Sequence, residues 1–81
     1  MKFKLSRHAK DVMENRNILE KWLYAILDNP SVTINVAEDE IHMYGIVYAY
    51  NERCLKIVVN PLTYVVVTTY FDRQMKKKGC K

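Results

Sequence analysis

The spacing of apolar residues changes once along the chain, from a helical repeat to the alternation of a strand. Before Pro30 the apolar positions recur every three or four residues, which predicts amphipathic helices at about residues 6–16 and 18–28. Ser6 can cap the first helix, and Asn17 can end it because asparagine tolerates left-handed backbone angles. Asn29-Pro30 ends the second helix, since a proline forces the residue before it out of helical geometry.

From residue 31 onward the repeat is two residues, and β-branched and aromatic side chains dominate. This pattern predicts four strands, at residues 32–36, 41–50, 54–60 and 63–71. Short connections join the last three strands, so we expect an antiparallel meander. The predicted fold is α+β, with an N-terminal helical hairpin packed on one face of a four-stranded, mainly antiparallel sheet. Residues 1–71 would form this single domain, and residues 72–81 a basic C-terminal tail.

Alternation within the strands assigns their side chains to two faces of the sheet. We expect the helices to cover the more apolar face, which would carry Ile41, Met43, Gly45, Val47, Ala49, Leu55, Ile57, Val59, Val65, Val67, Thr69 and Phe71. The other face would carry His42, Ile46, Lys56, Val58, Val66, Thr68 and five of the six tyrosines, namely Tyr44, Tyr48, Tyr50, Tyr64 and Tyr70. With no helix left to cover it, this second face is predicted to be open to water or to a partner.

Two interpretations of the tyrosines stand side by side. Tyrosine suits half-exposed strand positions because its ring packs on the sheet while its hydroxyl stays in water. Alternatively, a contiguous aromatic patch is a contact surface, since tyrosine is common at interfaces and stacks on nucleobases.

Charge is concentrated at the end of the chain. The protein has 81 residues and a net charge of +4. Residues 1–71 hold eight basic and eight acidic side chains, whereas residues 72–81 hold five basic groups and one acid. A basic end favours nucleic acid as a partner, although a solvated end is the ordinary alternative. The longest uncharged stretch, residues 57–71, is shorter than the roughly 20 residues that span a bilayer, so no membrane partner is expected.

Cysteine and glycine usage narrows the chemistry. Cys54 and Cys80 are the only cysteines, and they have no paired metal-ligand spacing. Without an apolar signal segment at the N-terminus, we expect two reduced thiols in a cytoplasmic protein. The two glycines form no phosphate-binding loop, so no cofactor is expected, and the cysteine spacing gives no reason to expect a metal.

An ordered set of short motifs runs through most of the chain. It comprises Ser6-Arg7-His8-Ala9, then Met13, Arg16 and Ile18, then Leu27-Asp28-Asn29-Pro30, and a closing strand Val66-Val67-Thr68-Thr69-Tyr70. From about Lys4 to Phe71, this set resembles a small bacterial family known as domain of unknown function 4258. Val12, Asn17 and Leu19 stand where that family has an arginine, a turn glycine and a helix-capping serine. Asn17 with Glu20 would therefore replace the missing cap.

The resemblance implies a function class. That family is similar, in its order of two helices followed by an antiparallel sheet, to RelE- and ParE-like toxins. It implies a toxin component of a toxin–antitoxin pair that acts on RNA or the translation machinery, with ribonuclease activity as one form. RNA or the ribosome and an antitoxin protein would be its partners. The alternative is a non-catalytic, protein-binding or self-associating module, such as a homodimer, that uses the tyrosine-bearing face or a strand edge.

RNA cleavage by the 2′-hydroxyl needs a proton acceptor, a proton donor and positive charge near the phosphate. The catalytic candidates are therefore His8, Arg16, Arg53 and Tyr70. The candidates for contact with RNA or a partner are Tyr44, Tyr48, Tyr50, Lys56, Tyr64, Arg73, Lys76, Lys77 and Lys78. His8 and Arg16 would lie about 12 Å apart along one helix, so they could only line two ends of a groove. A structural histidine, and an Arg16 that interacts with the helix dipole, remain the alternatives.

Overall fold

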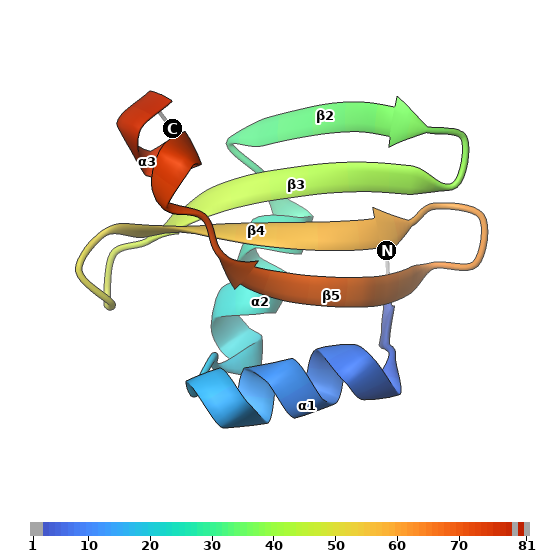
Figure 1. Ribbon diagram of the computed structural model, residues 1–81, viewed down its shortest axis with the longest axis horizontal. Coiled ribbons are helices and arrows are strands. Elements are labelled where there is room, and N and C mark those ends of the chain that lie inside the picture. The colour runs from blue at the N-terminus through green and yellow to red at the C-terminus, as the bar shows by residue number, and fades with distance from the viewer. Residues whose placement is uncertain (1–2, 79, 81) are drawn as a thin grey trace.

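The computed structural model describes residues 3–78 and 80, and it has an α+β fold, as predicted (Figure 1). In chain order the elements are β1 (Lys4–Leu5), α1 (Arg7–Arg16), α2 (Glu20–Asp28), β2 (Val32–Ala37), β3 (Glu40–Val47), β4 (Arg53–Asn60), β5 (Val65–Phe71) and α3 (Arg73–Lys78). No helix among these residues combines the length and the apolar character needed to cross a membrane.

The sheet has five strands where four were predicted, in the order β1-β5-β4-β3-β2. The meander of β2 to β5 is antiparallel, and the additional strand β1 pairs parallel to β5. The Lys4 amide donates to the Tyr64 carbonyl at 2.8 Å, and the Ser6 amide donates to the Val66 carbonyl at 3.0 Å. A strand of two residues is too short to show alternation, which is why the sequence pattern does not reveal it.

Local capping sets the ends of the first helix as expected. The Ser6 side chain accepts a hydrogen bond from the Ala9 amide at 3.0 Å. It also donates to the Val67 carbonyl at 2.8 Å, which ties the start of α1 to β5. Asn17 ends α1 in the left-handed conformation, with φ 54° and ψ 41°. The predicted Asn17 cap of the second helix is wrong, because Leu19 occupies that position and makes no side-chain capping bond.

Helices α1 and α2 lie on one side of the sheet and run in clearly different directions (Figure 1). The first packs against β5 and the second against β3 and β4, so they cover different strands instead of forming an isolated hairpin. Gly45 lets α2 approach closely, since a Cβ at this position would lie 2.6 Å from Cγ1 of Ile26. The buried core between the layers comprises Phe3, Ala9, Met13, Ile18, Leu23, Ile26, Val47, Leu55, Ile57, Val59 and Val66.

A bulge in β5 overturns part of the predicted division between faces. Val58 pairs with Thr68, but Val59 pairs with Val66, so Val67 is an extra residue in β5. Val66 is fully buried in the core, whereas 42% of Val67 is exposed. The prediction that Val65 and Val67 face the helices is therefore wrong, and Val66 takes their place. Beyond the bulge the alternation recovers, with Thr69 buried and Phe71 packed against the core.

The segment predicted as a basic tail contains α3, which packs against β4. Asp72 begins it: its amide donates to the Cys54 carbonyl at 2.8 Å, and its Oδ1 accepts from the Gln74 and Met75 amides, both at 3.0 Å. This turn brings Cys80 back to the sheet, where it forms a disulfide with Cys54, the two Cα atoms being 6.0 Å apart.

The prediction of two reduced thiols is therefore wrong. The two cysteines are 26 residues apart in the chain, and only the return of the chain through α3 brings them together. Disulfides are rare in the cytosol, so this bond does not support the cytoplasmic prediction, which was based on the lack of an apolar N-terminal segment.

Candidate functional site

Three residues form a row across the sheet on the side away from α1 and α2, here called the open face. Tyr44 of β3 pairs with Lys56 of β4, and Lys56 pairs with Tyr70 of β5, so their side chains share this face. The Lys56 ammonium lies 5.9 Å from the centre of the Tyr44 ring and 5.3 Å from that of Tyr70. Both distances suit cation–π attraction. We call these three residues the Lys56 row.

The surroundings of Lys56 keep it charged. Burial by itself lowers the pKa of Lys56, but a hydrogen bond with Tyr70 and the nearby Tyr44, Tyr70 and Asp72 groups favour the ammonium. The net result is a pKa raised above the usual 10.5. A lysine of this kind offers a fixed positive charge to an anion, and is poorly suited to act as a neutral amine nucleophile or base.

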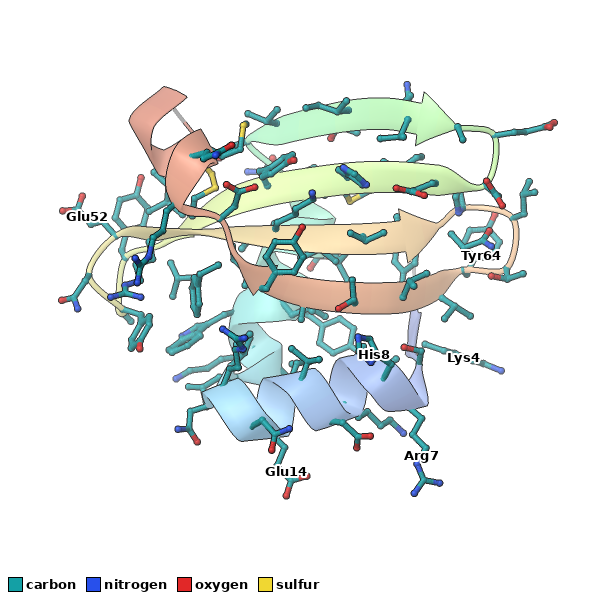
Figure 2. The ribbon with its side chains drawn as sticks, viewed as in Figure 1. Lys4, Arg7, His8, Glu14, Glu52 and Tyr64 are labelled. Atoms are coloured by element: carbon teal, nitrogen blue, oxygen red, sulfur yellow. A yellow bond between two sulfur atoms is a disulfide. The ribbon has the colours of Figure 1, made fainter. Side chains whose placement is uncertain are left out.

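The two tyrosines of the row differ in access. Tyr44 is only 4% exposed and is grouped with Cys54 and Cys80 in a second small core. Figure 2 shows the yellow disulfide bond close to α3, on the open side of the sheet. Tyr70 is 36% exposed. The prediction that Tyr44 is available for contact is therefore wrong, because the returning chain covers it.

The other predicted tyrosines do not complete an aromatic surface. Tyr48 and Tyr50 lie beyond the end of β3, in the connection to β4. The Tyr50 ring stacks at 5.8 Å on Trp22 of α2 and lies 5.1 Å from Phe71, which places it at the helical side. Tyr64 precedes β5 with a positive φ of 56°, and its ring lies 5.9 Å from that of Phe3.

The predicted tyrosine-bearing face is therefore wrong as a continuous surface. Tyr44 and Tyr70 remain on the open face, whereas the rings of Tyr50 and Tyr64 pack against Trp22 and Phe3 at the two ends of the strands. Tyr50 and Tyr64 fit the first interpretation of the tyrosines, in which the ring packs on a neighbouring ring while part of the side chain stays in water.

The four catalytic candidates do not meet in one place. His8 and Arg16 are exposed on α1, and Figure 2 shows His8 on that helix, below the sheet. The Arg53 guanidinium lies 5.2 Å from the centre of the Tyr50 ring, in the aromatic group at the start of β4. Tyr70 is on the open face, so the sheet stands between its hydroxyl and α1. A shared acid–base site would need these groups within hydrogen-bonding reach of one substrate.

Basic residues beside the open face come from α3. Arg73 is exposed at its first position. Lys76, Lys77 and Lys78 belong to the same helix, although their side chains lie outside the described part of the structure. The helix packs against β4, the strand that carries Lys56. Four basic residues of the sequence thus follow β5 in a segment adjacent to the Lys56 row.

Sequence reasoning missed two contributors to this face. One is the cover formed by Cys80, for which the two isolated cysteines give no signal. The other is Asp72, whose pattern Asp72-Arg73-Gln74-Met75 is that of a helix cap. A neighbouring pair, His42 Nε2 and Glu40 Oε2 at 2.6 Å, extends the polar groups of the open face. Within residues 3–78 and 80, no three His, Cys, Asp or Glu side chains gather to hold a metal.

Comparison with known proteins places the chain in a family. No curated protein and no protein of solved structure matches it. A family model described as "Domain of unknown function (DUF4258)" matches residues 5–71, the stretch from β1 to the end of β5 that carries the Lys56 row. The chain therefore belongs to the DUF4258 family.

Proposed function

We propose that this protein binds RNA through the open face, in a role like that of RelE- and ParE-like toxins. The observation that carries the proposal is the Lys56 row: a lysine held as a cation between two phenol rings on the sheet face that α1 and α2 leave uncovered. An RNA strand presents a phosphate, which is an anion, at every nucleotide.

The position of the Lys56 ammonium supports contact with the sugar–phosphate backbone of RNA. Lys56 is half-buried and fixed by neighbours on both sides, so it loses less side-chain freedom on binding than a fully exposed lysine. Tyr70, which is 36% exposed, offers part of its ring beside the Lys56 ammonium. Together they suit one phosphate and one stacked base.

Charge next to the row supports the same ligand. The α3 segment brings Arg73 and three lysines of the sequence alongside β4, whereas Asp72 offsets one of these charges. The net excess remains positive, which favours approach of a polyanion.

The proposal is one of binding and includes no acid–base pair. His8 and Arg16 lie on the opposite side of the sheet from Tyr70, so they are not assigned to a common reaction. RNA incubated with the protein and with its His8→Ala and Arg16→Ala forms should give the same pattern in all three cases. A cleavage pattern that either substitution abolishes would restore the catalytic assignment.

The binding test measures the anisotropy of a labelled single-stranded RNA across a range of salt concentrations. Lys56→Gln should weaken binding about fivefold, equivalent to about 1 kcal/mol, and should reduce the log–log salt slope by about 0.7, the loss of one phosphate contact on a single strand. Lys10→Gln is the matched control, because it removes the same charge from the exposed surface of α1 on the other side.

Equal affinities for the two variants would contradict the open face as the RNA surface. An absence of RNA affinity at low salt would contradict the whole proposal. A toxin-like role further predicts growth arrest when the protein is expressed in a bacterial host, with less arrest for Lys56→Gln than for Lys10→Gln at equal protein level.

A further inference from the structure

Strand β2 is an unprotected edge of the sheet. It pairs with β3 on one side and is the last strand in the order, so its other side presents unpaired backbone groups. All of its residues after Val32 are exposed, including Ile34 at 42% and Val36 at 51%. Helix α2 packs on β3 and β4, and Val32, at the start of β2, packs against the group of Tyr44, Cys54 and Cys80, so the rest of the strand is the exposed part.

The two edges of the sheet are not alike. At the other edge, β1 has only two residues, and one of them is Lys4. Short strands and lysines are ordinary ways of preventing edge-to-edge pairing. The sequence of β2, Val-Thr-Ile-Asn-Val-Ala, has no charge and no proline in its six residues. A register shift between Asn35 and Ala37 interrupts regular pairing near the end of β2, so residues 32–35 are the part suited to accept another strand.

We propose that two copies of this chain associate through β2, with the two strands antiparallel about a two-fold axis at Ile34. The inference stands apart from the proposed RNA contact, since it uses the edge of the sheet and not the Lys56 row. Backbone hydrogen bonds between the two β2 strands would join two five-stranded sheets into one continuous sheet.

In this register, residues of similar character in the two copies of β2 lie opposite each other. With Ile34 opposite Ile34, Thr33 lies opposite Asn35 and Val32 opposite Val36. The Ile34 pair lies on the open face, because Ile34 pairs with His42 of β3. Thr33 and Asn35 point to the helical side, as their partners Met43 and Ile41 do. The Ile34 pair is thus apolar on the open face, and the two Thr33–Asn35 pairs bring hydrogen-bonding side chains together on the helical side, as in stable cross-strand pairs. Val36 lies at a register shift of β2 and is not assigned to either face.

Charge favours the antiparallel arrangement. The acidic turn Glu38-Asp39-Glu40 follows β2 directly. In a parallel pair the two acidic turns would lie next to each other. In the antiparallel pair centred on Ile34, the two Glu38 residues are eight positions apart along the strand, about 27 Å at 3.4 Å per residue. That separation exceeds the screening length of about 8 Å at physiological salt, so the turns do not repel.

The association should be weak, because an edge contact between two strands buries little surface. Sedimentation velocity of the oxidised full chain, from micromolar to near-millimolar concentration, should show a reversible dimer. Hydrogen exchange of the β2 amides should slow as concentration rises, while exchange in the β4–β5 turn stays constant. Non-reducing electrophoresis should show monomer alone, since Cys54 and Cys80 pair within one chain.

The matched variants are Ile34→Lys and Val67→Lys. Both residues are β-branched, lie in strands and are 42% exposed, but only Ile34 is on the proposed interface. Ile34→Lys should weaken the dimer about tenfold or more by placing two ammonium groups opposite each other, and Val67→Lys should leave it unchanged. Val36→Lys is measured in parallel, with circular dichroism on each variant, so that one misfolded form does not decide the result.

Three outcomes would overturn the proposal. The first is a wild-type protein that stays monomeric over the whole range. In the second, the dimer leaves exchange at the β2 amides unchanged, which would place the contact elsewhere. The third is equal weakening by Ile34→Lys and Val67→Lys in folded protein.

Discussion

The two faces of the sheet are built in different ways from the same strands. On the helical face, Leu55, Ile57 and Val59 of β4 are completely buried beneath α1 and α2. On the open face, the same strand presents Lys56 to solvent and Cys54 to the returning chain. One face is closed by apolar packing of two helices, and the other is partly closed by one short helix and a disulfide.

This difference separates the tasks of stability and binding. The helical face has no accessible polar group among its central β4 residues, so it contributes burial and little else. The open face combines a fixed cation, a half-exposed phenol and the His42–Glu40 pair. Four changes test the contrast, taken here from the largest expected effect to the smallest.

The largest effect should come from the centre of the helical face. Leu55→Ala should lower the free energy of unfolding by about 4 kcal/mol, because it removes buried methyl groups and leaves a cavity. Urea denaturation followed by circular dichroism measures it. Leu62→Ala, at a position 65% exposed in the β4–β5 turn, should change stability by less than about 0.5 kcal/mol. Similar losses for both would contradict the assignment of Leu55 to the centre of the main core.

Removal of the disulfide tests what closes the open face. The double substitution Cys54→Ala with Cys80→Ala should cost about 3 kcal/mol, as expected for a cross-link over 26 residues. It should also increase hydrogen exchange in α3 more than in α1. A reducing agent should destabilise the wild type and leave the double variant unaffected, which serves as the control. Unchanged exchange in α3 would mean that helix packing alone holds this cover.

The close approach of α2 to β3 gives a third test. Gly45→Ala should destabilise the protein by about 2 kcal/mol, because the added methyl would press on Ile26. In an Ile26→Ala background the same substitution should cost at least about 1 kcal/mol less, since the added methyl then has room. A double-mutant cycle of urea midpoints measures this coupling. Additive losses would show that the helix shifts away instead of contacting the added methyl.

The smallest effect concerns the charge on Lys56. Tyr70→Phe should lower the pKa of Lys56 by removing a hydrogen bond to the ammonium, which NMR titration of the lysine side chain detects. Tyr48→Phe, at a ring 71% exposed in the β3–β4 connection, should leave that pKa unchanged.

The same raised pKa has a consequence for stability. The pKa of Lys56 is higher in the folded state than in the unfolded state. The contribution of Lys56 to the free energy of unfolding is therefore fully present below the unfolded pKa of 10.5 and is lost as pH rises through the folded pKa. Wild type should therefore lose more stability than Tyr70→Phe above about pH 10.

Much of the fold follows from local cues in the sequence. Ser6 and Asn17 are residues whose side chains or backbone preferences end helices without help from distant parts of the chain. In the connection between β3 and β4, Asn51 has a positive φ of 55°, a conformation that asparagine tolerates better than most residues. The family resemblance over most of the chain is also confirmed, by a match over residues 5–71.

The candidate site was harder to predict because it depends on non-local placement. An extra residue in the Val65-Val66-Val67 run leaves no mark in a stretch of identical side chains, yet it reverses which valine is buried. Tyr48 and Tyr50 follow strand alternation in sequence but lie past the last paired residue of β3. Lys56 and Tyr70 were correctly assigned to one face, since both lie beyond the bulge in regular pairing.

The cross-link between Cys54 and Cys80 makes β4, β5 and α3 parts of one covalent ring. Leu62, the most exposed large apolar residue of the β4–β5 turn, lies inside that ring. A protease that cuts there would open the loop without separating the two fragments, because the sulfur bridge still joins them. The nicked molecule would gain one water molecule in mass, stay in one piece under oxidising conditions, and divide in two only when a thiol is added.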